Sequence, residues 1–116
     1  MSKRINEEFI SKRIRLNDKI IETGNTETKR FFGLDARVFE NGELNSITKE
    51  LMGLTASFVL RYDDCIHYHL LQCHDLGVTR AEFTETFNVA LVVGGSIVIP
   101  HVRTAVEILD ELMADS

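Results

Sequence analysis

The scarcity of helix breakers constrains the fold of this chain more than any other feature of its sequence. One proline and seven glycines interrupt 116 residues. No segment shows the sustained apolar–polar alternation that is typical of a half-buried strand. Apolar residues recur at helical spacing instead, as at Leu51, Leu54 and Phe58. The sequence therefore predicts an all-α bundle of about six helices.

Capping and turn residues predict where these helices begin and end. We expect Asn45 to be the N-cap of one helix and Asp63 or Asp64 to be the N-cap of the next. Thr79 and Glu82 have the spacing of a capping box, and Pro100 suits the first turn of the last helix. The predicted helices are 6–22, 27–32 (broken by Gly33), 45–61, 64–77, one opening at Thr79, and 100–112, whereas 34–40 is ambiguous. The stretch 89–99 is apolar all round, which predicts a helix buried on all sides. A small helical monomer has too little surface to cover it, so we expect an oligomer to supply the cover.

Length and charge limit the classes of function. We expect one domain over 1–116, with N-terminal helices in 1–44 and a core in 45–112. A net charge of −5 argues against general nucleic-acid binding. No apolar stretch is long enough to span a bilayer, and no apolar core follows the opening residues as it would in a secretory signal. Two cysteines without such a signal indicate a reducing compartment, so we expect a cytoplasmic protein with no membrane partner.

The run Asp64-Cys65-Ile66-His67-Tyr68-His69 carries the strongest chemical signal. Cys65 and His69 lie one helical turn apart, and Glu50 precedes the cysteine by fifteen residues. A thiol reacts as its thiolate, so a reactive cysteine needs a nearby base. A helix N-terminus would lower the pKa of Cys65, whereas the neighbouring carboxylates would raise it. These residues are candidates for thiol chemistry.

Cys73 extends the same helix face, which leaves two other interpretations open. A metal could recruit the thiolates and the imidazole, but no fourth ligand beyond Glu50 is evident, so we expect neither a metal nor a cofactor. Cys73 itself is typical of a small buried apolar residue. We expect His67, His74 and His101 to be exposed or structural.

The stretch from Glu50 to about Leu109 resembles the carboxymuconolactone decarboxylase family, which includes alkylhydroperoxidase D. The matching segments are Lys49-Glu50-Leu51, Asp64-Cys65-Ile66-His67-Tyr68-His69, Leu76-Gly77-Val78-Thr79-Arg80-Ala81-Glu82-Phe83 and Val93-Gly94-Gly95. The resemblance implies an alkylhydroperoxidase D-like helical fold. It also implies a homo-oligomer, either a trimer or a hexamer built from dimers, and we favour the hexamer.

The redox branch of that family carries Glu, an eleven-residue gap and then Cys-x-x-Cys-x-x-x-His. By resemblance, Glu50, Cys65 and His69 are catalytic, with Cys65 attacking a peroxide and the other two relaying the proton. Tyr62 stands at the place of the resolving cysteine and would line the pocket. Cys73 lies about 12 Å along the same helix, beyond the reach of a disulfide. An external thiol or Cys65 of another subunit would then have to reduce the oxidised thiol.

Three functions remain open at this stage. The first is a peroxidase-like, antioxidant oxidoreductase that takes a small-molecule peroxide and an external thiol reductant. The second is a decarboxylase-like enzyme, in which His69 and Glu50 act as acid and base on a small carboxylate or lactone. The third is a non-catalytic oligomeric binding protein, because a fold alone does not confer activity.

Overall fold

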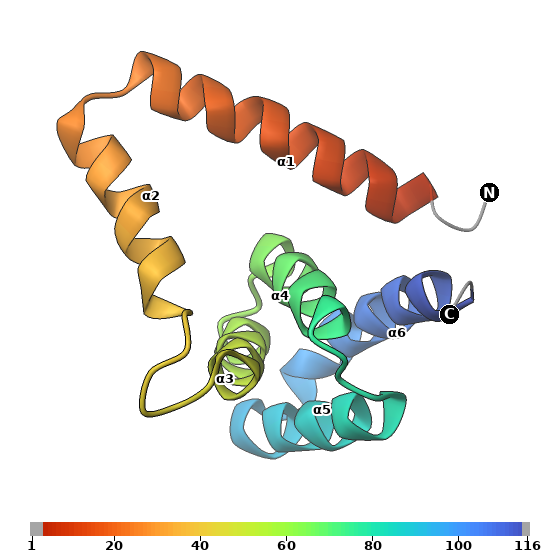
Figure 1. Ribbon diagram of the computed structural model, residues 1–116. Coiled ribbons are helices and arrows are strands. Elements are labelled where there is room, and N and C mark those ends of the chain that lie inside the picture. Colours follow the sequence, from red (N-terminus) through yellow and green to blue (C-terminus); the bar gives the residue numbers. More distant parts are fainter. Residues whose placement is uncertain (1–3, 115–116) are drawn as a thin grey trace.

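The computed structural model describes residues 4–114, and within them the chain is helical without any strand (Figure 1). The all-α prediction is confirmed. The elements are α1 (Arg4–Thr23), α2 (Thr26–Val38), α3 (Ser46–Val59), α4 (Asp63–Asp75), α5 (Arg80–Gly94), the 3₁₀ turn η1 (Ser96–Val98) and α6 (Ile99–Met113).

Helices α3 to α6 pack into one bundle, and α1 and α2 form an N-terminal arm that reaches beyond it (Figure 1). Helix α3 packs against both α4 and α5, and α6 packs against α4. The bundle encloses a single apolar core. Its fully buried members include Leu54, Phe58, Leu70, Phe83 and Leu109. Burial of such large apolar side chains supplies most of the favourable free energy of folding.

Side-chain caps fix the start of several helices where the sequence predicts them. The Asn45 side chain accepts from the Thr48 N–H at the start of α3. Thr79 and Glu82 form a reciprocal capping box at α5. Pro100 occupies the first turn of α6. Each cap satisfies backbone N–H groups that have no partner within the helix.

The prediction of a short helix from Glu27 that ends at Gly33 is wrong, and the ambiguous stretch after it is helical as far as Val38. Gly33 does not break the helix, and α2 runs without interruption from Thr26 to Val38. A single glycine inside a helix costs only about 1 kcal/mol relative to alanine, which flanking helical residues and a cap can offset. Asn25 supplies that cap through a capping box with Thr28. None of the α2 residues is buried.

The prediction that 89–99 forms one continuous helix is also wrong. Helix α5 ends at Gly94, and Gly95 adopts a φ of 85°, a left-handed conformation that side chains disfavour. The chain then turns through η1 into α6. Val92 is 86% exposed and Val93 65% exposed. The second half of α5 therefore presents an apolar surface that this chain leaves uncovered.

The first turn of α1 is fastened to the bundle by a polar network. The buried Asn6 side chain donates to Glu111 Oε2 of α6 at 2.7 Å, and Asn6 Oδ1 lies 2.6 Å from His67 Nε2 of α4. The Phe9 ring stacks on the His67 ring with centroids 3.8 Å apart. His67 is thus structural, as expected. This network fixes the beginning of the arm against α4 and α6.

Candidate functional site

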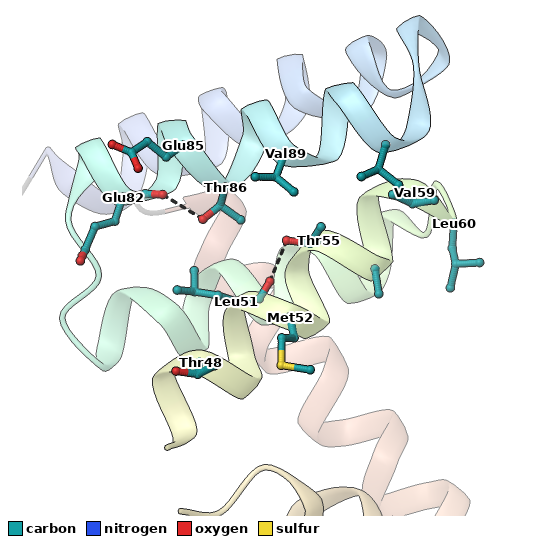
Figure 2. A pocket seen from close by; sticks show the side chains of 12 residues that line it. Thr48, Leu51, Met52, Thr55, Val59, Leu60, Glu82, Glu85, Thr86 and Val89 are labelled. Atoms are coloured by element: carbon teal, nitrogen blue, oxygen red, sulfur yellow. Dashed lines mark hydrogen bonds between the residues drawn. The ribbon is translucent and has the colours of Figure 1, made fainter. Parts of the chain in front are cut away.

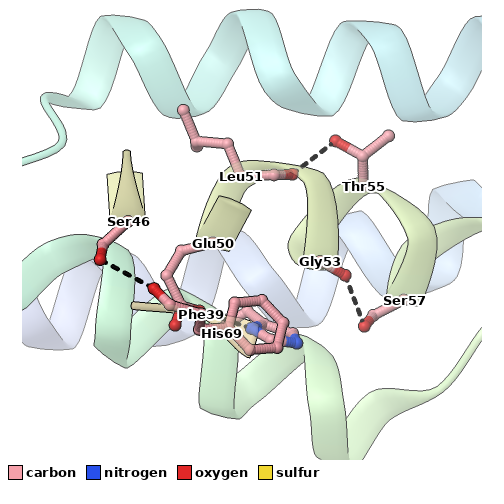
Figure 3. A network of polar contacts seen from close by, with 8 residues as sticks. All are labelled: Phe39, Ser46, Glu50, Leu51, Gly53, Thr55, Ser57 and His69. Atoms are coloured by element: carbon pink, nitrogen blue, oxygen red, sulfur yellow. Dashed lines mark hydrogen bonds and ion pairs between the residues drawn. The ribbon is translucent and has the colours of Figure 1, made fainter. Parts of the chain in front are cut away.

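Glu50 and His69 form a buried hydrogen-bonded pair between α3 and α4 (Figure 3). His69 Nδ1 lies 2.7 Å from Glu50 Oε1, and the two residues are only 7% and 4% exposed. A carboxylate oxygen can only accept, so Nδ1 carries the proton of this bond. In the neutral ring, Nε2 then has a free lone pair and can act as a base. The sequence predicts that Glu50 and His69 act together, and the structure places their side chains in hydrogen-bond contact.

The imidazole is held on three sides. An ideal Cβ placed on Gly53 of α3 would lie 2.8 Å from His69 Cε1 and 2.9 Å from its Nε2, so only glycine admits the ring at this distance. The Phe39 ring lies beside it, with centroids 5.4 Å apart. The Ser46 hydroxyl donates to the Phe39 carbonyl at 2.7 Å and so fixes the chain between α2 and α3 (Figure 3). His69 therefore has little freedom to leave Glu50.

A cavity of about 330 Å³ lies next to this pair. Glu50 from α3 and Tyr68 from α4 line it, and so do Asp35 and Ala36 of α2 and Phe39, the C-cap of that helix. Cys65 is not among its lining residues. The Glu50 carboxylate thus has access to a space large enough for a small molecule.

Cys65 lies in the first turn of α4 and is half-buried. Burial raises the pKa of its thiol, whereas a side-chain hydrogen bond with Tyr62 lowers it. The carboxylate of Asp64 raises this pKa further, and the Arg13 guanidinium lowers it. The net direction is upward, so Cys65 rests as a neutral thiol and needs a base before it can attack.

Tyr62 lies directly before α4 and is 52% exposed. The charge of a Cys65 thiolate and the hydrogen bond between the two side chains are the largest causes that raise the pKa of Tyr62. The residue before it, Arg61, has a φ of 58° and makes the sharp turn out of α3. This turn places Tyr62 as the N-cap of α4, where its side chain makes no capping bond.

The prediction that an aspartate caps α4 is therefore wrong. Asp63 is already the first helical residue, and its side chain bonds His101 Nδ1 of α6 at 2.5 Å. Asp64 follows it within the first turn. Both carboxylates still lie at the positive end of the helix dipole, which they complement.

The structure joins the predicted site residues in two groups. Glu50 bonds His69, and Tyr62 bonds Cys65, but among residues 4–114 no hydrogen bond links the sulfur to either member of the buried pair. Cys65 and His69 are one turn apart on α4, which separates their Cβ atoms by about 5–6 Å. A small molecule or water between them would be in reach of both.

Two residues near the site escaped sequence reasoning. Burial and the Glu50 charge raise the pKa of Tyr68, and the charge of Cys65 contributes less, so the Tyr68 hydroxyl senses both groups of the site. The Arg13 guanidinium of α1 lies 3.8 Å above the centre of the Tyr68 ring, in cation–π geometry. In the sequence, Arg13 is one of several basic residues in a helix with no visible link to the cysteine.

Cys73 is fully buried in the bundle core. Burial raises the pKa of its thiol to about 12, and the nearby Glu50 charge acts in the same direction. It is the small apolar core residue that the sequence favours. Among residues 4–114 no group of three or more His, Cys, Asp or Glu side chains is arranged to hold a metal, and no helix there is long and apolar enough to cross a membrane.

Fold and site together define a small all-α protein with a buried carboxylate–imidazole pair and a half-buried cysteine one turn away. The chain belongs to the carboxymuconolactone decarboxylase family, whose sequence profile it matches over residues 27–110. The match includes α2 and most of α6. The resemblance drawn from the sequence is thereby confirmed.

Solved structures of similar proteins agree with this assignment. Two crystal structures of a Thermotoga maritima protein share 54% identity with the chain. The first has a TM-score of 0.89 and covers 91% of this chain and 93% of the other. The second has a TM-score of 0.86 and coverages of 90% and 89%; its protein is described as a carboxymuconolactone decarboxylase family member for which an antioxidative role has been suggested.

A third similar structure is a family protein from Legionella pneumophila in its apo form. It is 24% identical, with a TM-score of 0.68 and coverages of 95% and 92%. At that identity the likeness supports the fold alone. A comparison with curated proteins gave no match.

Proposed function

We propose that this protein is a peroxidase-like oxidoreductase in which Cys65 is the reacting thiol and Glu50 and His69 relay its proton. The observation that carries the proposal is the buried 2.7 Å bond between His69 and Glu50, one helical turn from a half-buried cysteine. The antioxidative role suggested for the Thermotoga maritima protein, at 54% identity, supports the same class of chemistry.

The raised pKa of Cys65 makes the relay necessary. His69 Nε2 takes the thiol proton, directly or through a water, and Glu50 stabilises the imidazolium through Nδ1. The thiolate then attacks one peroxide oxygen, the O–O bond breaks, and the alkoxide leaves with the proton returned by His69. One thiol and one hydroperoxide become one sulfenic acid and one alcohol.

Recycling has to come from outside the helix. Tyr62 offers no second sulfur, and Cys73 is fully buried. Two equivalents of an external thiol would restore Cys65: the first forms a mixed disulfide and releases water, and the second releases the free thiol and a disulfide product. Tyr62 would act instead as a hydrogen-bond donor to the attacking sulfur.

The test is stoichiometric oxidation of the protein by an organic hydroperoxide, followed by trapping of the sulfenic acid with a dione reagent and mass spectrometry. One adduct on Cys65 is expected. Cys65→Ser should abolish it, Glu50→Gln should slow it at least tenfold, and Cys73→Ser serves as the matched thiol control with unchanged labelling. Oxidation of Cys65 no faster than that of a free cysteine, or unaffected by Glu50→Gln, would refute the relay.

A decarboxylase-like function is the second candidate, and one observation favours it. The cavity beside the buried pair is lined by Glu50 and not by Cys65. Glu50 and His69 could then exchange protons with a small carboxylate or lactone without any thiol step. Turnover of a muconolactone-type acid that survives Cys65→Ser would establish this function. Inertness in both assays would leave a non-catalytic binding protein.

A further inference from the structure

Two hollows border helix α3, and they differ in chemistry. A groove of about 950 Å³ lies between α3 and α5 (Figure 2). Two of its hydroxyl groups are turned back onto their own helices. Thr55 donates to the Leu51 carbonyl at 2.9 Å, and Thr86 donates to the carbonyl one turn before it at 2.8 Å. The groove thus offers mainly apolar surface, whereas charged side chains line the cavity of about 330 Å³ next to Glu50.

Three helices and the segment after α2 bring four carboxylates to this cavity. The carboxylates belong to Asp35 of α2, Glu40 just after that helix, Glu50 of α3 and Asp75 at the end of α4. No lysine or arginine side chain lines the cavity. Within residues 4–114, Glu50 pairs only with His69, and none of the other three carboxylates forms an ion pair. The lining of the cavity therefore carries an excess of negative charge.

Two basic side chains near the cavity contact other groups. The Arg13 guanidinium lies 3.8 Å above the centre of the Tyr68 ring, and Lys49 Nζ donates to the Glu40 backbone carbonyl at 2.8 Å. Burial raises the pKa of the Tyr68 hydroxyl, and the charges of two of the lining carboxylates act in the same direction, whereas Arg13 opposes them. Arg13 thus offsets part of the negative charge at this wall, but the cavity has no basic group of its own.

One oxygen of the buried Glu50 carboxylate has no partner. Oε1 is bonded to His69 Nδ1, whereas Oε2 makes no hydrogen bond within residues 4–114. In this part of the chain, no side-chain oxygen or nitrogen that is closed off from solvent lacks a partner, so Oε2 is open to the cavity that Glu50 lines. A charged oxygen on a side chain that is only 4% exposed costs free energy unless a donor meets it. The cavity is therefore suited to a ligand that brings a hydrogen-bond donor.

Apolar side chains form the other walls of the cavity. Phe39 and Tyr68 supply aromatic rings, and Ala36 and Leu76 supply aliphatic surface (Figure 3 shows Phe39 beside Glu50). Aromatic rings attract a positive charge and also cover the alkyl part of an organic cation. A metal ion does not suit this lining, because within residues 4–114 no three acidic, histidine or cysteine side chains converge to hold one. Separated carboxylates and aromatic walls together suit an ammonium group carried by a small organic molecule.

We propose that the cavity next to Glu50 binds the ammonium group of a small organic amine, with Glu50 Oε2 accepting a hydrogen bond from it. Asp35 and Asp75 are exposed and contribute negative charge at the rim. A cavity of about 150 Å³ holds benzene, so a volume of about 330 Å³ has room for about 6–12 non-hydrogen atoms.

The charge of the ligand also bears on the proposed function, which uses the same Glu50. A carboxylate in this cavity would meet four like charges, which disfavours an anionic hydroperoxide and the acid of a decarboxylase-like reaction. A neutral or ammonium-bearing molecule meets no such repulsion. Binding of the amine itself requires no reaction of Cys65.

Titration of the whole ¹⁵N-labelled chain, followed by NMR, tests the proposal with three probes of similar size. They are phenethylammonium, the neutral 2-phenylethanol and the anionic 3-phenylpropionate. A dissociation constant of about 10 mM or lower is expected for the ammonium, given its size. It should bind at least about tenfold more tightly than the other two at low salt, shift the ring nitrogens of His69, and lose part of its preference at high salt. Equal binding of the three probes, a preference for the carboxylate, or no binding of the ammonium at about 10 mM would overturn the proposal.

Variants at the rim test the charge without altering the buried pair. Asp35→Asn and Asp75→Asn should each weaken binding of the ammonium about threefold and leave binding of the alcohol unchanged. Glu107→Gln is the matched control, because it removes one exposed carboxylate from α6, which does not line the cavity. Ammonium binding that is indifferent to both rim variants, or equally weakened by the control, would place the amine elsewhere and refute the proposal. These readouts do not involve Cys65, so their failure would leave the peroxidase test standing, and failure of that test would leave the amine site standing.

Discussion

Replacing Gly53 by alanine tests how the His69 imidazole is held. The new Cβ would lie 2.8 Å from His69 Cε1, 2.9 Å from Nε2 and 3.2 Å from Nδ1. Two of these contacts are closer than real Cβ atoms tolerate, and they involve the ring itself rather than the end of a flexible chain. The ring has to move by several tenths of an ångström. Since Phe39 lies beside it, that movement displaces Nδ1 from Glu50.

Two opposing terms decide the sign of the effect on stability. Alanine inside a helix is worth about 0.8–1.0 kcal/mol over glycine. Against this, weakening a buried hydrogen bond to a charged group costs about 1.5–3 kcal/mol, and overpacking has a similar cost. The loss exceeds the gain, so Gly53→Ala should lower the free energy of unfolding by about 1–2 kcal/mol.

Urea unfolding at pH 7.5 measures this difference, and Gly33→Ala is its matched control. Gly33 also lies within a helix, but a Cβ there meets only the Arg37 guanidinium at 3.2 Å, which is the flexible end of an exposed side chain. We expect Gly33→Ala to stabilise the protein by about 0.5–1 kcal/mol. If Gly53→Ala stabilises the chain to the same extent, with the ¹⁵N shifts of the His69 ring unchanged, the close packing inferred here is refuted.

Three further predictions follow from other sites. Burial lowers the pKa of His67, so as the pH falls the unfolded chain takes up a proton on this histidine before the folded chain does. The free energy of unfolding should therefore fall below about pH 6.5, by at most about 1.4 kcal/mol per pH unit. Urea unfolding at a series of pH values measures this decrease, and His67→Asn should reduce it. Arg61→Gly should stabilise the chain by about 0.5–1 kcal/mol, because φ is 58° there, and a loss of stability would contradict this. Cys73, with its pKa raised to about 12, should resist a thiol reagent at pH 8 in the native state, so that native Cys65→Ser remains unlabelled.

Local signals in the sequence were sufficient for the class of fold and for most helix starts. Asn45 and the Thr79–Glu82 box are side-chain-to-backbone bonds over three residues, so the sequence contains both partners at a fixed distance. The place of Glu50 beside the apolar stripe of α3 also indicated a side chain directed toward the core. Its pairing with His69 followed from the family resemblance, because spacing in the sequence does not relate residues on two different helices.

The remaining features depend on contacts between distant segments. Arg13 contacts Tyr68 because the first turn of α1 is fastened to α4. No local pattern in the sequence predicts that contact. The need for glycine at position 53 arises from a ring on another helix. The end of α5 at Gly94 is a different case. Apolar side chains on every face of 89–99 indicate burial, but they do not show that the chain turns within the segment at Gly95, where φ is 85°.

The fastening of α1 at Asn6 has a mechanical consequence. Helix α1 is 20 residues long, about 30 Å, and two contacts fix its direction: the His67–Asn6–Glu111 network at its first turn and the Arg13–Tyr68 contact halfway along it. A change of about 10° in that direction would carry the far end of the helix, and α2 with it, through about 5 Å. Asn6 and Arg13 together therefore set where α2, one wall of the cavity next to Glu50, stands.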